Sequence, residues 1–110
     1  MEVTHMKAII NGFRYDTDKA IEIGSREHGE IVTNLDYWEA TLYVTKRAHR
    51  YFLAGTGGAM TTWARSTGQN ETSGGEGIRV MTKAEALAWA EQYLEPEEIE
   101  AGFSEDIQDA

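Results

Sequence analysis

Cysteine is absent from this 110-residue sequence, and proline occurs once. Without cysteine the chain has no disulfide framework and no thiolate ligands for a metal ion. Long apolar runs are also missing, because the longest covers only residues 86–90, and residues 1–5 lack the basic and apolar regions of a secretory signal. These absences argue against secretion and membrane spanning, and they predict a cytoplasmic protein.

Basic residues are scarce in the last part of the chain. The 19 acidic and 10 basic residues give a net charge of −9. Nine of these acids but only one base, Lys83, lie in residues 82–110, so this segment carries −8 and the remainder −1. A nearly neutral body therefore ends in a concentrated negative field.

The length and the 41% hydrophobic content predict one folded domain with a single core. Patterned sequence begins at Met6, so residues 1–5 are interpreted as an N-terminal extension and residues 6–110 as the domain. Residues 82–110 form its acidic, helical C-terminal part.

Turn chemistry and alternation predict the strands. Asn11-Gly12 is typical of a type I′ turn and predicts a hairpin over residues 6–15, after which residues 16–18 cap a helical turn over residues 19–22 and an extended edge segment follows. Apolar and polar residues alternate over 37–45, with Trp38, Ala40, Leu42 and Val44 on one side. A second hairpin pairs this strand with residues 51–54 through a basic tip at residues 46–50.

Seven of the eleven glycines lie in residues 55–77, which are interpreted as a long irregular connection with one helical turn at residues 60–64. A last strand is expected over residues 77–81. Thr82 and Glu85 match a capping box, which predicts a helix over residues 83–94. Pro96 then begins another helix, which Gly102 and Ser104 break.

The fold class is α+β, with a mostly antiparallel sheet of about five short strands and C-terminal helices on one face.

Several runs resemble those of a group of small, acidic, largely uncharacterised proteins of bacteria, phages and mobile elements. The resemblance covers about residues 6–109, and the matching runs are residues 11–17, 42–45, 51–61, 73–78 and 85–91. It implies a bacterial host and no established reaction. Some small acidic proteins of this setting inhibit host nucleases or CRISPR effectors, so an anti-CRISPR or other anti-defence inhibitor is one implication.

The acidic C-terminus is the leading candidate for partner binding. Carboxylates at fixed spacing would compete for the lysines and arginines that neutralise nucleic-acid phosphates, while repelling nucleic acid itself. The hypothesis is a non-enzymatic inhibitor that blocks a basic nucleic-acid-binding surface of a host protein, with Glu91, Glu95 and Glu98 on one shared side. An ordinary solvated helix face explains the same acids. The candidate residues are Glu91, Glu95, Glu97, Glu98, Glu100, Glu105, Asp106 and Asp109.

Lys46, Arg47, Arg50 and Trp63 form a second candidate contact set. The basic tip would suit phosphates, an acidic partner or the acidic tail of another copy, which leaves a homodimer open, although loop tips of this kind are often only solvated. Trp63 is either an exposed interaction anchor or a cover over one end of the sheet. The alternative to inhibition is accordingly a structural or regulatory homo-oligomer without nucleic-acid mimicry.

Sequence patterns of catalysis or cofactor binding are not found. The glycine runs lack the Lys-Ser/Thr continuation of a phosphate-binding loop and are interpreted as turns. His5, His28 and His49 do not show the spacing of a helical metal pair, and no nucleophile accompanies a recognisable base. We therefore expect no enzymatic activity, no catalytic residues, no cofactor and no metal.

Overall fold

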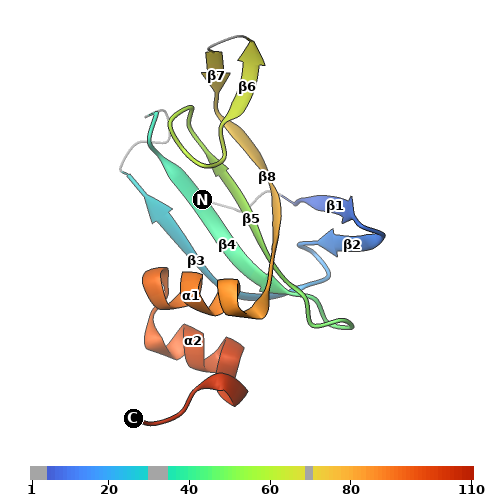
Figure 1. Cartoon of the computed structure of the whole chain (residues 1–110), viewed down its shortest axis with the longest axis vertical. Helices are drawn as coiled ribbons and strands as arrows, with labels where there is room; N and C mark the ends of the chain where they lie inside the picture. Colours follow the sequence, from blue (N-terminus) through green and yellow to red (C-terminus); the bar gives the residue numbers. More distant parts are fainter. Residues whose placement is uncertain (1–4, 30–34, 69–70) are drawn as a thin grey trace.

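A four-stranded antiparallel sheet is the centre of the fold (Figure 1). The computed structural model describes residues 5–29, 35–68 and 71–110. The sheet has the order β3 (Ile21–His28), β4 (Trp38–Val44), β5 (Tyr51–Gly57) and β8 (Gly75–Met81). Helix α1 (Lys83–Tyr93), helix α2 (Pro96–Phe103) and a 3₁₀ turn, η1 (Ser104–Asp106), follow at the C-terminal side. The predicted α+β class with an antiparallel sheet and C-terminal helices is confirmed.

Two hairpins extend from this sheet. Strands β1 (Lys7–Ile10) and β2 (Phe13–Asp16) form one, and β6 (Arg65–Gly68) and β7 (Glu71–Ser73) form the other. The first hairpin has the predicted turn, because Asn11 and Gly12 adopt φ values of 52° and 82°. The helical turn expected over residues 19–22 is wrong. The N–H groups of Lys19 and Ala20 both donate to the Asp16 carbonyl, and the chain then enters β3 at once.

Apolar side chains cover both faces of the sheet. Ala40, Leu42 and Leu53 pack on the helical side against Ala86, Ala90 and Phe103. Tyr43, Phe52 and Ala54 point the other way and meet Tyr15 of the first hairpin. The alternation predicted for residues 37–45 is confirmed, but the buried residues form two clusters separated by the sheet, in place of the single core expected.

The glycine-rich segment is mostly regular structure, so its interpretation as an irregular connection is wrong. Strand β5 continues to Gly57, β8 begins at Gly75, and the two strands pair along their full length with Gly55 opposite Gly77. The residues expected to form a helical turn form two successive turns, closed by bonds from Thr61 N–H to the Gly58 carbonyl and from Ala64 N–H to the Thr61 carbonyl. Gly55 lies within β5 because the Trp63 ring occupies the space that a side chain at this position would need.

The helices begin and end where their sequence predicts. The Thr82 hydroxyl accepts from the Glu85 N–H at 3.1 Å, and the Glu85 carboxylate accepts from the Thr82 N–H at 2.8 Å, which completes the capping box of α1. Pro96 opens α2, and the predicted break is confirmed because the chain tightens into η1 after Phe103. None of the helices that the structure describes has the length and apolar character to cross a membrane.

Candidate functional site

The predicted acidic residues are mostly exposed. Glu97 and Glu100 lie three residues apart on α2 and are both exposed, whereas Ile99 is half-buried and Phe103 is buried. Glu91 lies near the end of α1, and Glu95 lies in the junction between the helices. We call Glu91, Glu95, Glu97 and Glu100 the acidic surface. Glu105 and Asp109 are exposed further along the chain.

Two of the predicted acids have internal partners. The half-buried Glu98 carboxylate accepts a hydrogen bond from the Glu95 N–H at 3.0 Å and lies against Gly24 of β3, so it does not share an exposed side with Glu91 and Glu95 as expected. Asp106 forms an ion pair with Lys83 at 2.9 Å, and this bond raises the pKa of the Lys83 ammonium. In the residues described, this is the one ion pair that the structure records for the segment 82–110.

The acidic surface is attached to the sheet by tight packing under α2. The Phe103 ring is buried and stacks on Tyr51, with ring centroids 5.1 Å apart. Gly102 lies so close to Ile23 that a Cβ atom at this position would be 2.7 Å from Cγ2 of the isoleucine. These contacts fix the helix, so its outer carboxylates project from a folded element.

The basic residues of the second contact set are divided between two hollows. Lys46 and Arg47 line one of about 520 Å³ together with Arg14 and Lys19. The Arg50 guanidinium lies 3.9 Å above the Phe13 ring and also lines a hollow of about 560 Å³ that includes Glu105 and Asp106. Glu105 and Asp106 therefore lie beside the cations Arg50 and Lys83, whereas the acidic surface lines neither of these hollows.

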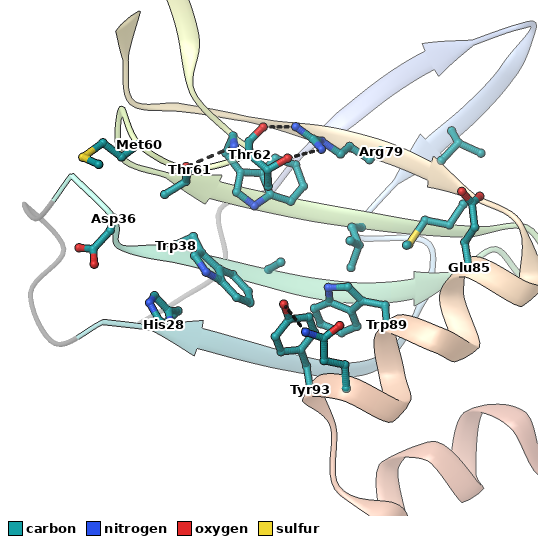
Figure 2. A pocket seen from close by; sticks show the side chains of 16 residues that line it. His28, Asp36, Trp38, Met60, Thr61, Thr62, Arg79, Glu85, Trp89 and Tyr93 are labelled. Atoms are coloured by element: carbon teal, nitrogen blue, oxygen red, sulfur yellow. Dashed lines mark hydrogen bonds between the residues drawn. The ribbon is translucent and has the colours of Figure 1, made fainter.

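Trp63 is buried, with 7% of its surface exposed. Trp63 therefore covers the sheet, as one of the two interpretations of the sequence expected. Little of its ring is exposed to serve as an interaction anchor, the other interpretation. A Cβ atom on Gly55 would be 2.3 Å from the Trp63 ring, so the indole requires glycine beneath it. Above the ring, the Arg79 guanidinium carbon lies 4.7 Å from the centroid, and its nitrogens donate to the hydroxyl and carbonyl of Thr62 (Figure 2).

An aromatic groove of about 660 Å³ lies beside Trp63, between the sheet and α1. Trp38 of β4 lies toward its floor, while Trp89 and Tyr93 reach into it from α1 (Figure 2). All three side chains are half-buried, so parts of their rings are exposed. Among the acids, lysines and arginines of the lining, Asp36 and Glu85 provide two negative charges and Arg79 provides one positive charge.

The rings of this groove are in mutual contact. Tyr93 meets Trp38 edge to face, with centroids 5.2 Å apart, and meets Trp89 at 5.1 Å. His28 stacks on Trp38 with centroids 5.9 Å apart and an interplanar angle of 12°. The groove is thus a preformed aromatic surface, of a size within the usual range for ligand sites.

The groove was not predicted from the sequence. Its aromatic residues come from β4, the turn before β6 and α1, so no local spacing unites them. Two signals were present. Large Trp38 and small Ala40 alternate on the inward side of one strand, and Trp89 and Tyr93 lie four residues apart on one helix.

Two polar clusters lie apart from the acidic surface and the aromatic groove. His5, Asp16 and Asp18 place ligand-type atoms within 4.8 Å of one another, but Asp16 accepts from the Asp18 N–H at 2.9 Å and contacts His5 Nε2 at 2.8 Å, so local hydrogen bonds account for them. Burial acts to raise the pKa of Asp16, but the hydrogen bonds with Asp18 N–H and His5, together with the charges of His5 and Lys7, outweigh it and leave the pKa below its ordinary value. Burial, together with the bond that the Tyr37 hydroxyl donates to Glu39, raises the pKa of Tyr37 to about 12.

Comparisons of the chain with protein-family models, curated proteins and solved structures gave no match. The resemblance to small acidic proteins of phages and mobile elements stays a prediction. The surfaces described above therefore carry the functional argument.

Proposed function

We propose that this protein is a non-enzymatic inhibitor that binds a basic nucleic-acid-binding surface of a host protein through its acidic surface. The observation that carries the proposal is the exposure of Glu97 and Glu100 on a helix that is fixed by Phe103 and Gly102. Packing of the helix fixes the backbone that carries these carboxylates, so their positions on the surface suit charge recognition.

The charge of the whole chain supports a basic protein, and not a nucleic acid, as partner. A net charge of −9 repels phosphates, whereas it attracts surfaces that carry lysine and arginine. The acidic surface is exposed, and its attraction to a partner is screened over about 8 Å at physiological ionic strength. Binding should therefore weaken as salt is added, and nucleic acid should compete for the partner.

The test is affinity capture from a bacterial host extract with two charge-matched variants. One replaces Glu91, Glu97 and Glu100 by glutamine, and the other replaces Glu22, Glu27 and Glu76, which are exposed on β3 and β8. Both change the net charge from −9 to −6, and both leave the Glu98 cap intact. Only the position of the lost charge differs between them.

We expect the first variant to bind the captured basic protein roughly tenfold more weakly, because each exposed charge pair contributes about 0.2–1 kcal/mol. The second variant should retain binding, and added DNA or RNA should release the partner. Equal capture by the two variants would show that the acidic surface is not the contact. A salt-resistant dimer in light scattering, with no basic partner captured, would favour the homo-oligomer instead.

A further inference from the structure

The aromatic groove between the sheet and α1 has no role in the proposed function, although it has the more defined shape of the two surfaces. Trp38, Trp89 and Tyr93 present partly exposed rings within one hollow of about 660 Å³. These rings pack on one another, but they are only half-buried. Burial of apolar surface therefore does not by itself explain why three aromatic side chains gather here. The chemistry of the lining indicates what would occupy it.

The groove already holds one arginine against one tryptophan. Arg79 lies 4.7 Å above the Trp63 ring, and its planar guanidinium also donates to Thr62. Arginine suits this contact because its guanidinium is planar, weakly hydrated and able to stack on an aromatic face while its N–H groups bond in the plane. This pair shows that the wall of the groove accepts a guanidinium on an indole ring.

Charge favours a second cation in the same hollow. Asp36 and Glu85 line the groove and are exposed, so its lining carries two negative charges against the one positive charge of Arg79. The chain as a whole carries −9, which disfavours the stacking of a nucleic-acid base on these rings because its phosphates would be repelled. A side chain that offers both a flat cation and donors for a carboxylate fits the lining on both counts.

We infer that the groove receives an arginine side chain of the basic protein partner, stacked on the exposed faces of Trp89 and Tyr93, with Asp36 or Glu85 accepting from its guanidinium. This inference rests on the proposed function, because it takes the partner to be basic. It assigns specificity to the groove and general attraction to the acidic surface. The two surfaces use different chemistry, so they are separable by experiment.

The probe is a short peptide in which arginine alternates with glycine, measured by isothermal titration calorimetry against the full chain. In two matched peptides arginine is replaced by lysine or by citrulline. Lysine keeps the positive charge but lacks a planar group, whereas citrulline keeps a planar group but is neutral. The variants are Trp89→Leu, Tyr93→Leu and Asp36→Asn. Phe13→Leu is the control, because Phe13 is 41% exposed on β2 and does not line the groove.

We expect the arginine peptide to bind more tightly than the lysine peptide and the citrulline peptide to bind weakest. Trp89→Leu and Tyr93→Leu should each weaken arginine-peptide binding by about tenfold, the loss expected for a partly desolvated cation–π contact. Asp36→Asn should weaken it by a smaller factor, and Phe13→Leu should leave it unchanged. Far-ultraviolet circular dichroism of each variant checks that the fold is retained.

Some outcomes would overturn the inference. It is wrong if a folded Trp89→Leu or Tyr93→Leu variant binds the arginine peptide as tightly as the unchanged protein, if the citrulline peptide binds equally well, or if single-stranded oligouridine binds in the groove instead. Loss of binding on replacing Glu91, Glu97 and Glu100 alone, with the groove variants unaffected, would reject the groove and retain the acidic surface. The reverse pattern would retain the groove and reject the acidic surface.

Discussion

Replacement of Gly55 by alanine tests the packing that builds the wall of the groove. A Cβ atom at this position would lie 2.3 and 2.5 Å from two atoms of the Trp63 ring and 2.9 Å from the Glu39 carbonyl oxygen of the neighbouring strand. Ordinary contacts begin near 3.4 Å. Neither neighbour is the end of a flexible side chain, so the indole ring has to move by about an ångström.

The free energy of unfolding that Gly55→Ala removes lies between two limits. Overpacking in a rigid interior typically costs about 1–3 kcal/mol, and losing a buried tryptophan from its site costs about 3–5 kcal/mol. We expect Gly55→Ala to lower the free energy of unfolding by roughly 2–4 kcal/mol, a large part of the about 5–15 kcal/mol typical of a domain. The Arg79 contact with the displaced ring should weaken at the same time.

The chain provides a matched control for this change. Gly77 is the residue paired with Gly55 across β5 and β8, and a Cβ atom there meets nothing within 4 Å. Gly77→Ala should be neutral or stabilise by up to about 1 kcal/mol, because alanine restricts the unfolded chain. Urea unfolding followed by circular dichroism measures both variants, and tryptophan fluorescence reports the ring. Equal unfolding free energies for the two variants would refute the packing argument.

Two further predictions concern buried rings. Phe103→Ala should destabilise the protein by about 3–5 kcal/mol, because the ring is 1% exposed and anchors α2, and partner capture should fall with it; a loss under about 1 kcal/mol in urea unfolding would contradict this anchoring. The raised pKa of Tyr37 means that its contribution to stability is complete below the ordinary tyrosine value of about 10 and is lost as the pH rises toward about 12. The pKa of Tyr43 is also raised by burial, so an ultraviolet titration should show late phenol ionisation whose amplitude falls by one phenol in Tyr37→Phe; an unchanged amplitude in that variant would contradict the assignment to Tyr37.

The sequence predicts those elements that depend on a few neighbouring residues. Asn11-Gly12 specifies its turn because both positions need a positive φ, and Thr82 with Glu85 specifies the start of α1 because their bonds span one helical turn. The strand at β4 follows from a period of two. These features need no knowledge of the rest of the fold.

The features missed depend on contacts between distant residues. Gly55 is a turn signal by composition, yet it lies inside β5 because a ring from residue 63 occupies the space of its side chain. Glu98 belongs to an acidic run, but the cap of α2 and the approach to Gly24 turn it toward β3. The aromatic groove likewise exists only after β4, the 58–63 turn and α1 meet. In each case tertiary packing decides the role, and a local pattern does not contain it.

The division of the buried residues into two clusters has a consequence for how this protein tolerates change. The first hairpin packs on one face of the sheet and the helices pack on the other, and the sheet backbone lies between them. Substitutions that reshape the helical face can accumulate while the opposite face continues to hold the strands in register. Changes on the helical side therefore leave the packing of the first hairpin against the opposite face intact.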